Sequence, residues 1–330
     1  MSHQPLRIGL IGAGGISLNH LPHLLALGAE VYVYSQEGAA ELVAAHGGTA
    51  VETLDELLDR VDIVDVVTPT VTHFDVVSRA LEAGKHVISE KPLTRTPEQA
   101  SELLQKAADA GRQLYPAHVV RWFPEYVQLK RAVDAGQLGE LAVLRFSRSG
   151  AYPTRTPWFA DRALSGGIIM DQMIHDLDIA RWVAGEVVTV SAVSSRAGDA
   201  TAPVEAAHVL LTHASGAISH IAGLWGPEHL AFTTEFSVSG TGGTLEHSSA
   251  AQRNVLTDLA VSTVGGEAVP DTDPAEDPYY LELQDFLRAF ADGETPRVTA
   301  ADGAAAVAIA AAALESLETG QPVDLTAKGW

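Results

Sequence analysis

The sequence of 330 residues contains no cysteine. Disulfide bonds, thiolate nucleophiles and cysteine-bound metals are therefore excluded from its chemistry. Basic residues are few, with 21 lysines and arginines against 42 aspartates and glutamates, and the formal net charge is −21. A surface this acidic repels phosphate groups, so we expect neither a nucleic-acid partner nor binding to anionic lipid.

Long apolar runs are also missing. No uninterrupted stretch reaches the length of about 18 apolar residues that a membrane span needs, so we expect no such span. Residues 1–7 lack the basic start and apolar run of a signal peptide, and we expect a cytoplasmic protein. The 46% hydrophobic and 19% charged residues are typical of a globular protein, and the length suggests two domains.

The first 120 residues alternate short apolar runs with helical patterns. Strands alternating with helices at this spacing predict a doubly wound parallel sheet, so the fold class is α/β. We assign residues 1–120 to this nucleotide-binding domain. The expected strands lie at residues 7–11, 30–34, 62–67, 85–89 and 113–117.

Longer alternating runs follow from residue 141 onward. They predict a large, mostly antiparallel sheet with one open face, in an α+β domain over residues 121–330 that binds substrate and oligomerises. An apolar open face would favour a homodimer or a homotetramer. Residues 265–277, rich in Pro, Asp and Glu, are expected to form an exposed loop. The runs lie at residues 142–148, 187–196, 206–212, 217–223 and 232–239, with helices expected at 171–183, 278–290 and 303–317.

A glycine-rich turn follows the first strand and opens the first helix. Gly12 permits the tight turn, Gly14 lets the backbone approach a pyrophosphate, and Ser17 takes the third small position. The helix start, with Gly15 and Ile16, offers free N–H groups and a positive dipole end to phosphates. This context predicts a Rossmann dinucleotide site.

The cofactor type stays open at the end of the second strand. An acidic residue is expected there when the adenosine ribose has a free 2′-hydroxyl, but Tyr34 is followed by Ser35 and Gln36. The missing carboxylate removes repulsion of a 2′-phosphate, yet no arginine follows to bind one. Glu37 could hydrogen-bond the ribose instead, or Ser35 and Gln36 simply begin a loop. Both NAD and NADP are compatible with this pattern.

A lysine, Lys91, stands at the carboxyl end of the fourth strand, between Glu90 and Pro92. Ligands of open α/β sheets bind beyond the carboxyl ends of the strands. A lysine beside a nicotinamide can donate to a substrate hydroxyl and stabilise developing alkoxide charge. The other interpretation is a surface lysine in a turn, the commoner position for this residue.

A second candidate group lies in the helix expected over residues 171–183. Asp171 and His175 are four residues apart and share one helix face, with Asp178 close to it. A carboxylate can orient a histidine, which then accepts a hydroxyl proton. The spacing also suits metal ligands or a pair on the helix surface, and on spacing alone the surface pair is commoner. We predict no metal site.

Three motifs occur in a fixed order between Ile8 and about Trp182. The first is Thr-Pro-Thr-Val-Thr-His at 68–73, and the second is Ala-Gly-Lys-His-Val at 83–87 followed by Glu-Lys-Pro at 90–92. The third is a pair of glycines followed by Asp-x-x-x-His-x-x-Asp, over 166–178. Together they resemble the glucose–fructose oxidoreductase, inositol dehydrogenase and rhizopine catabolism (Gfo/Idh/MocA) family. The chain departs from the commonest pattern at Ile168, where a third glycine is usual, and at Ser35.

The resemblance implies an NAD(P)-dependent oxidoreductase that transfers hydride between nicotinamide and a hydroxyl or carbonyl carbon of a sugar, polyol or inositol-like substrate. It implies that Lys91 and His175 handle protons and that Asp171 orients the substrate hydroxyls, so that all three contact the substrate. A cis peptide bond before Pro92 is implied as well. The residues implied to line the cofactor are Thr68, Pro69, His73, Glu90 and Lys91.

Other substrate contacts are expected near the domain junction, from His118, Arg121, Tyr152 and Trp158. Trp158 equally suits packing, and His118 equally suits a buried, hydrogen-bonded position. Two other functions stay open. One is a nicotinamide-dependent glycosidase in which oxidation is transient. The other is a non-catalytic, cofactor-sensing protein, which would usually lack the lysine or the histidine.

Overall fold

The computed structural model describes residues 5–154, 157–199, 203–250, 256–259 and 277–328. Contacts between residues divide the chain into two compact units, residues 1–122 with 275–304, and residues 123–274 with 305–330. The division expected at residue 120 differs from these units in one respect, because residues 275–304 pack with the first unit. The loop expected over 265–277 lies outside the described residues, apart from Asp277.

The first unit contains a six-stranded parallel sheet in the order β3-β2-β1-β4-β5-β6. Its inner strands are mostly apolar because both faces of a doubly wound sheet are covered, and Leu10, Val64 and Ile88 are fully buried. The predicted parallel sheet is confirmed. Its strands are β1 (Arg7–Ile11), β2 (Glu30–Tyr34), β3 (Thr49–Ala50), β4 (Ile63–Val66), β5 (His86–Glu90) and β6 (Leu114–Ala117).

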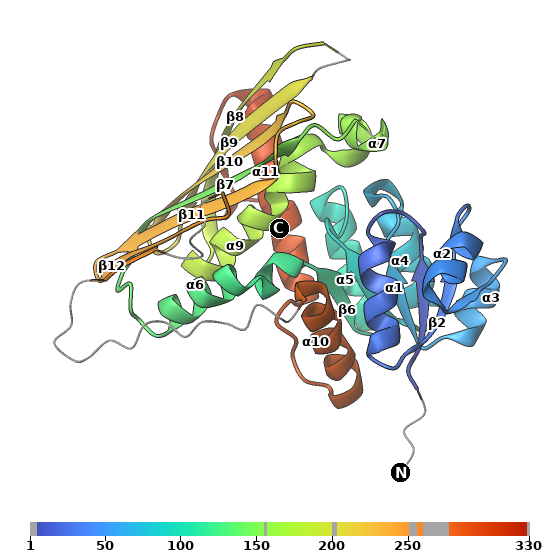
Figure 1. Ribbon diagram of the computed structural model, residues 1–330. Helices are drawn as coiled ribbons and strands as arrows, with labels where there is room; N and C mark the ends of the chain where they lie inside the picture. The colour runs from blue at the N-terminus through green and yellow to red at the C-terminus, as the bar shows by residue number, and fades with distance from the viewer. Residues whose placement is uncertain (1–4, 155–156, 200–202, 251–255, 260–276, 329–330) are drawn as a thin grey trace. The chain divides into compact units, whose positions relative to one another are not determined.

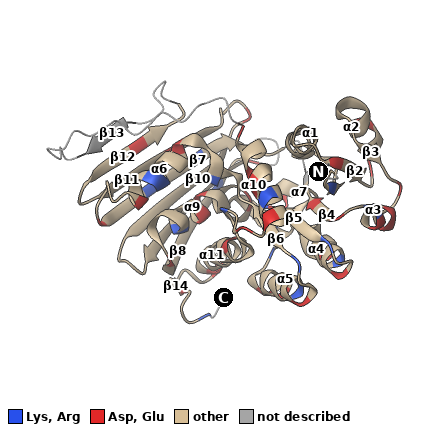
Figure 2. Ribbon diagram, turned by 90° about the horizontal axis from the view of Figure 1, so that it is seen from below, with Lys and Arg blue, Asp and Glu red and all other residues tan. Residues whose placement is uncertain are grey.

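Helices connect these strands, and their starts have local causes. The side chain of Thr96 accepts the Gln99 N–H and Pro97 takes the first turn, so α5 begins at Pro97. Figure 2 shows acidic residues on α3, α4 and α5. The helices are α1 (Ser17–Ala26), α2 (Ala39–His46), α3 (Leu54–Arg60), α4 (His73–Glu82) and α5 (Pro97–Ala110), with the 3-10 turns η1 (Thr70–Thr72) and η2 (Val119–Trp122).

Helix α10 (Pro278–Asp292) is distant in sequence from the first unit but packs within it. The Tyr115 ring stacks on Phe286 and Phe290, with centroids 5.4 and 4.7 Å apart. Trp122 meets Phe286 edge-on at 5.7 Å. These aromatic contacts explain why α10, although distant in sequence, packs within the unit that contains the parallel sheet.

The second unit contains an eight-stranded sheet in the order β13-β12-β11-β7-β10-β9-β8-β14. Only β7 and β10 pair in parallel among its described strands, and the others pair antiparallel, so the expected mostly antiparallel sheet is confirmed. The strands are β7 (Leu141–Ala151), β8 (Val187–Ala197), β9 (Val204–His213), β10 (Ile218–Gly226), β11 (Thr233–Gly240), β12 (Gly243–Ser248), β13 (Leu256–Leu259) and β14 (Val323–Asp324).

Helices cover one face of this sheet, and Figure 1 shows α6 (Pro124–Asp134) and α9 (Ile174–Ala184) on that side. Side chains on β7 alternate accordingly, with Leu144, Phe146 and Arg148 buried. The short helices α7 (Pro157–Ala160) and α8 (Arg162–Ser165) and the π-helix η3 (Ile169–Met173) lie between β7 and α9 in the chain. On the other face, Val193, Leu210 and Ile218 are exposed in the part of the chain that the structure describes.

Helix α11 (Ala300–Thr319) begins in the first unit and continues in the second. By length and composition it is the one helix in the described part of the chain that could cross a membrane, and half of its most apolar window is buried inside the structure. Ala306, Val307, Ala310 and Ala313 are fully buried. The alanine-rich run is therefore packed as a core helix, and it includes the helix expected over residues 303–317.

Candidate active site

The glycine-rich turn joins β1 to α1. Gly12 has φ of +119°, and a Cβ atom there would lie 2.8 Å from the carbonyl oxygen of Val67, so only glycine fits. At Gly14 and Gly15 an added Cβ would meet nothing within 4 Å. The Ser17 hydroxyl closes the turn by donating to the Gly14 carbonyl at 2.5 Å. The backbone in front of α1 therefore faces open space.

A cavity of about 440 Å³ opens beside this turn. It lies at the carboxyl ends of β1, β2 and β4, where a doubly wound sheet binds its ligand. Six residues predicted for the cofactor line it, whereas Gly15 and Ile16 lie in the turn at its edge. The lining residues are Ile11, Gly12, Ala13, Gly14, Tyr34, Ser35, Gln36, Glu37, Leu54, Val67, Thr68, Pro69, Thr72 and Val76.

These residues fit a dinucleotide. The cavity volume is in the usual range of about 300–1,000 Å³ for small-molecule sites. The turn before α1 offers helix N–H groups and a positive dipole end to a pyrophosphate. At the other end of the cavity, beyond β2, Ser35, Gln36 and Glu37 supply polar groups for an adenosine ribose.

His73 connects the cavity wall to the turn that carries Lys91. Its Nδ1 lies 2.8 Å from the Pro92 carbonyl oxygen, and its Nε2 lies 2.8 Å from the Thr68 carbonyl oxygen. Burial lowers the pKa of His73, and the hydrogen bonds to the two carbonyls oppose this change only in part. A neutral ring donates to one of the two carbonyls at a time. His73 is thus connected to the cofactor cavity through its contact with the backbone of Thr68, which lines the cavity.

Lys91 stands immediately after β5 and is half-buried. Its backbone N–H donates to a carboxylate oxygen of Glu90 at 2.9 Å. The Lys91–Pro92 peptide bond is cis, as the resemblance implied. β5 pairs with β4, whose end leads into Thr68 and Pro69, so Lys91 leaves the sheet next to the cavity-lining strand.

Asp171 and His175 belong to the second unit, and both are half-buried. The sequence predicts one helix over residues 171–183. In the structure its start is different, because Asp171 lies in the π-helix η3 and His175 lies in the first turn of α9. A π-helical turn changes the angular offset between the two residues, and such turns are frequent at functional sites. Asp178 is buried in α9.

A buried ion pair secures this helical segment. The Arg148 guanidinium donates two hydrogen bonds to the Asp176 carboxylate, at 2.8 and 2.9 Å. Burial would lower the pKa of Arg148, but the charge of Asp176 and these bonds outweigh it and raise that pKa. The Gln172 amide donates to the Arg148 carbonyl at 2.8 Å. Strand β7 therefore fixes the segment on either side of His175.

The other predicted substrate residues have protein partners. Arg121 is buried, donates to the Arg297 carbonyl at 2.9 Å and lies 3.3 Å from the Asp302 carboxylate, which gives it a structural function. The Tyr152 hydroxyl accepts from Arg196 at 3.1 Å. Trp158 stacks on Phe159 with centroids 3.9 Å apart, and His118 is fully buried. Substrate contact by these four residues stays a prediction.

The sequence analysis missed a buried group of ionisable side chains in the first unit. It contains His20, Asp65 and Glu282, together with Glu90, which was predicted for the cofactor. A signal for it exists, because Asp65 interrupts the apolar run of β4 and carboxylates are almost never buried without partners. No group of three or more His, Asp or Glu suited to a metal occurs among the described residues.

Comparison with known proteins places this geometry in a family. Residues 6–118 match the model of an oxidoreductase family with an NAD-binding Rossmann fold, and residues 126–246 match the GFO/IDH/MocA C-terminal domain. The chain is 31% identical to scyllo-inositol 2-dehydrogenase (NAD(+)) of Bacillus subtilis (strain 168), with 99% of this chain and 98% of that protein covered. It is also 31% identical to 1,5-anhydro-D-fructose reductase of Ensifer adhaerens, with 97% and 98% covered.

A solved structure of similar fold is that of a putative myo-inositol dehydrogenase from Sinorhizobium meliloti 1021. It has a TM-score of 0.79 and 25% identity, and the match covers 97% of this chain and 99% of that chain. The two domain models and the relatives that match over nearly the full length of the chain together establish its family. The chain belongs to the GFO/IDH/MocA family of NAD-binding oxidoreductases.

Proposed function

We propose that the protein is an NAD-dependent dehydrogenase that oxidises a secondary hydroxyl of an inositol, cyclic sugar or related polyol. The names of the relatives that match over almost the whole chain support this substrate class, because they act on inositols and on an anhydro sugar. The chain retains Lys91, Asp171 and His175, the residues that the family motif implies for the reaction.

The observation that carries the proposal is the connection made by His73. Its ring contacts both the Thr68 carbonyl, in the wall of the cofactor cavity, and the Pro92 carbonyl, next to Lys91. This contact fixes the backbone of Lys91 relative to the cavity within one unit. A lysine held there is suited to donate to an oxygen of a substrate bound beside the nicotinamide.

The proposed roles follow from the chemistry of each group. Bound NAD supplies the hydride acceptor. His175 accepts the proton of the reacting hydroxyl, so that the carbon loses a hydride and the oxygen a proton as the carbonyl forms. The Lys91 ammonium donates to the same oxygen and stabilises its developing negative charge. Asp171 accepts hydrogen bonds from neighbouring substrate hydroxyls and orients the ring.

A preference for NAD is part of the proposal. None of the described residues that line the cavity is a lysine or an arginine, and Glu37 lies beside Ser35 and Gln36. A carboxylate at this end accepts a hydrogen bond from a ribose hydroxyl and repels a 2′-phosphate. Glu37 therefore replaces the acidic residue that was expected directly after β2.

The direct test is a spectrophotometric screen of inositols, polyols and sugars with NAD and with NADP. The proposal predicts that NADH accumulates in proportion to product with at least one inositol or cyclic polyol. Release of an aglycone from a glycoside without net NADH formation would instead identify a glycosidase. Binding of NAD without turnover of any compound in the panel would contradict the proposed dehydrogenase.

We also propose that two or four copies associate through the open face of the eight-stranded sheet. Large apolar side chains are exposed there, and Val193, Leu210 and Ile218 have exposed fractions of 66%, 46% and 43%. The strand register places them on one face. An exposed patch of this kind is typical of an interface. The cytoplasmic location belongs to this proposal too, and cell fractionation tests it.

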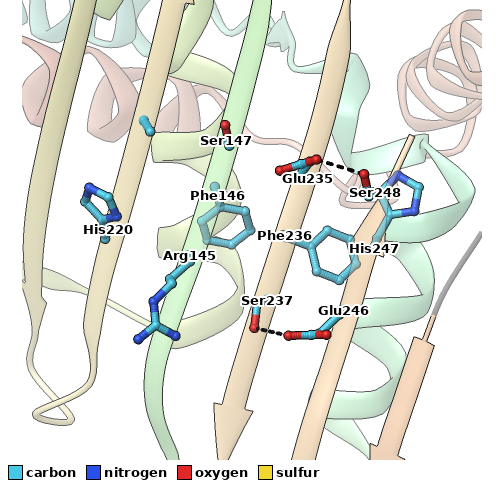
Figure 3. Close-up of a pocket in the computed structure, with 11 residues that line it drawn as sticks. Arg145, Phe146, Ser147, His220, Glu235, Phe236, Ser237, Glu246, His247 and Ser248 are labelled. Carbon is cyan, nitrogen blue, oxygen red and sulfur yellow. Dashed lines mark hydrogen bonds between the residues drawn. The ribbon is translucent and has the colours of Figure 1, made fainter. Parts of the chain in front are cut away.

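Polar residues continue the same face toward β12. Figure 3 shows Arg145 and His220 on one side of a hollow of about 530 Å³, with Glu235 and Glu246 on the other. Ser248 and Ser237 donate to these glutamates at 2.8 and 2.9 Å. The Arg145 cation beside the two glutamates is self-complementary under a two-fold axis, so a second copy is the occupant that we propose.

A further inference from the structure

Four ionisable side chains lie together in the interior of the first unit. They come from four elements, His20 from α1, Asp65 from β4, Glu90 from β5 and Glu282 from α10. His20, Asp65 and Glu282 are fully buried, and Glu90 is 7% exposed. A buried charge is costly unless a partner compensates it, so the protonation state of this group needs an explanation.

The geometry of His20 fixes its state. Nδ1 lies 2.8 Å from a carboxylate oxygen of Asp65. Nε2 lies 3.3 Å from a carboxylate oxygen of Glu90, an ion-pair distance that lacks the alignment of a good hydrogen bond. A ring with a carboxylate at each nitrogen is best satisfied when both nitrogens carry protons. This arrangement favours the imidazolium form of His20 between the two carboxylates.

The pKa directions agree with this assignment. Burial would lower the pKa of His20, but the charges of Asp65 and Glu90 and the hydrogen bond to Asp65 outweigh it and hold that pKa well above its ordinary value. Burial would likewise raise the pKa of Glu90, but the close contact with the charged His20 ring lowers it. Burial raises the pKa of Glu282 well above its ordinary value, and the charge of Glu90 adds to this. These effects favour the neutral acid form of Glu282.

Other charged and titratable groups face the cluster from the surrounding elements. The Tyr279 ring of α10 lies 6.2 Å from the His20 ring, and Asp285 on the same helix acts on Glu282. Lys91, directly after β5, acts on Glu90, and His73 at the start of α4 interacts with the Glu90 charge. The positive charges of His20 and Lys91 both lower the pKa of Glu90.

Glu90 connects the cluster to the proposed site. One of its carboxylate oxygens faces His20, and the other accepts the backbone N–H of Lys91 at 2.9 Å. A rotation of the Glu90 carboxylate that improves its contact with His20 would lengthen its contact with the Lys91 N–H, and the reverse also holds. The orientation of the Lys91 backbone therefore depends on the charge of His20, because both groups contact the Glu90 carboxylate.

We propose that His20, as an imidazolium held between Asp65 and Glu90, is a positioning residue for Lys91 and makes hydride transfer sensitive to its own deprotonation. The proposal rests on the proposed function in that it takes Lys91 as the group that acts on the substrate. His20 itself acts through Glu90.

The first test is a ring-¹⁵N NMR titration of histidine-labelled full-length protein over about pH 6 to 9. The wild type should show one ring with both nitrogens protonated at neutral pH, and this signal should be missing in His20→Gln. Asp65→Asn and Glu90→Gln should each lower its titration midpoint by about one pH unit or more. Glu282→Gln should leave the midpoint in place, because a neutral amide replaces a neutral acid. A neutral His20 in the wild type at neutral pH would overturn the proposal.

The second test measures turnover. His20→Gln and Glu90→Gln should each lower kcat by about 10- to 100-fold, as small misplacement of a reacting group does. The NAD dissociation constant, read by fluorescence, should change by less than about threefold, because the adenosine end of the cavity is untouched. Glu82→Gln, on the exposed end of α4, is the matched control. In Glu90→Gln the fall in kcat at high pH should begin at lower pH than in the wild type.

The outcomes separate the two proposals. Unchanged kcat and an unchanged pH profile in a folded His20→Gln protein, or in Asp65→Asn if His20→Gln does not fold, would disprove the positioning role. Wild-type turnover in Lys91→Ala would disprove the proposed function of Lys91. The NMR titration would still report the charge of His20 in that case, because it needs no substrate.

Discussion

His73 and Pro92 are 19 residues apart in the chain and are joined by a contact of 2.8 Å between the imidazole Nδ1 and the carbonyl oxygen. The second ring nitrogen contacts the Thr68 carbonyl at the same distance. The ring is buried in the first unit, so water cannot replace these contacts without rearrangement. One side chain therefore holds both the cavity wall and the turn that follows β5.

Replacement of this ring should affect stability and the cofactor site together. His73→Phe keeps an aromatic ring but removes the hydrogen bond that the imidazole donates to a backbone carbonyl, which should lower the free energy of unfolding by about 1–3 kcal/mol. It should also weaken NAD binding, since Thr68 lines the cavity. Urea denaturation and a fluorescence titration measure the two effects. His46→Phe, exposed at the end of α2, is the control, and equal stability of the two variants would contradict the role of His73.

Glu37 should determine the choice between NAD and NADP. Glu37→Arg removes repulsion of a 2′-phosphate and adds a cation that pairs with it. We expect the ratio of kcat/KM for NADP over NAD to rise at least about tenfold, or about 1.4 kcal/mol. Glu41→Arg changes the charge by the same amount on the exposed side of α2 and should leave the ratio near that of the wild type. A wild-type enzyme that prefers NADP would disprove the role given to Glu37.

The open face of the eight-stranded sheet should hold the oligomer together. Light scattering of the wild type should give two or four times the chain mass of 34.8 kDa. Leu210→Glu introduces repelling charges into the proposed interface and should shift the mass toward the monomer. Leu18→Glu, at an exposed apolar position of the first unit, should not change the mass. A wild type that is monomeric at assay concentration excludes this interface.

The buried cluster should make stability depend on pH in a defined direction. The folded pKa values of His20 and Glu282 are raised, so both groups contribute stability that is present at low pH and lost as pH rises through those values. Glu90 has a lowered pKa and contributes stability above its unfolded pKa that is lost as pH falls through the folded value. Glu282→Gln should therefore flatten the alkaline loss of stability. Urea denaturation of the variant and the wild type at increasing pH measures this loss. Parallel curves of unfolding free energy against pH would contradict a neutral Glu282.

The sequence was sufficient for those features that depend on local patterns. The glycine turn between β1 and α1 is readable because Gly12 needs a positive φ, and α5 is readable from Thr96 and Pro97. The alternation along β7 to β11 was enough to predict a mostly antiparallel sheet. Patterns of this kind involve neighbours in the chain, which is why one sequence carries them.

Features that depend on distant contacts were not predictable in the same way. Helix α10 was expected as a helix, but its return to the first unit depends on Phe286 and Phe290 meeting Tyr115, far away in the sequence. The π-helix η3 replaces the expected α-helical start at Asp171 without a glycine or proline to mark it. His20 and Asp65 are 45 positions apart and read as isolated polar residues until the sheet brings α1 and β4 together.

The most direct test of the account compares steady-state turnover in Lys91→Ala, His175→Ala and the wild type, on the inositol or polyol that the screen identifies. Lys106→Ala, a lysine on α5 that pairs with Glu82, serves as the control. The account predicts that both site variants bind NAD normally but lose at least about 100-fold in kcat, because each removes a group that acts on the reacting oxygen. Near-normal turnover by Lys91→Ala with NAD bound would contradict it.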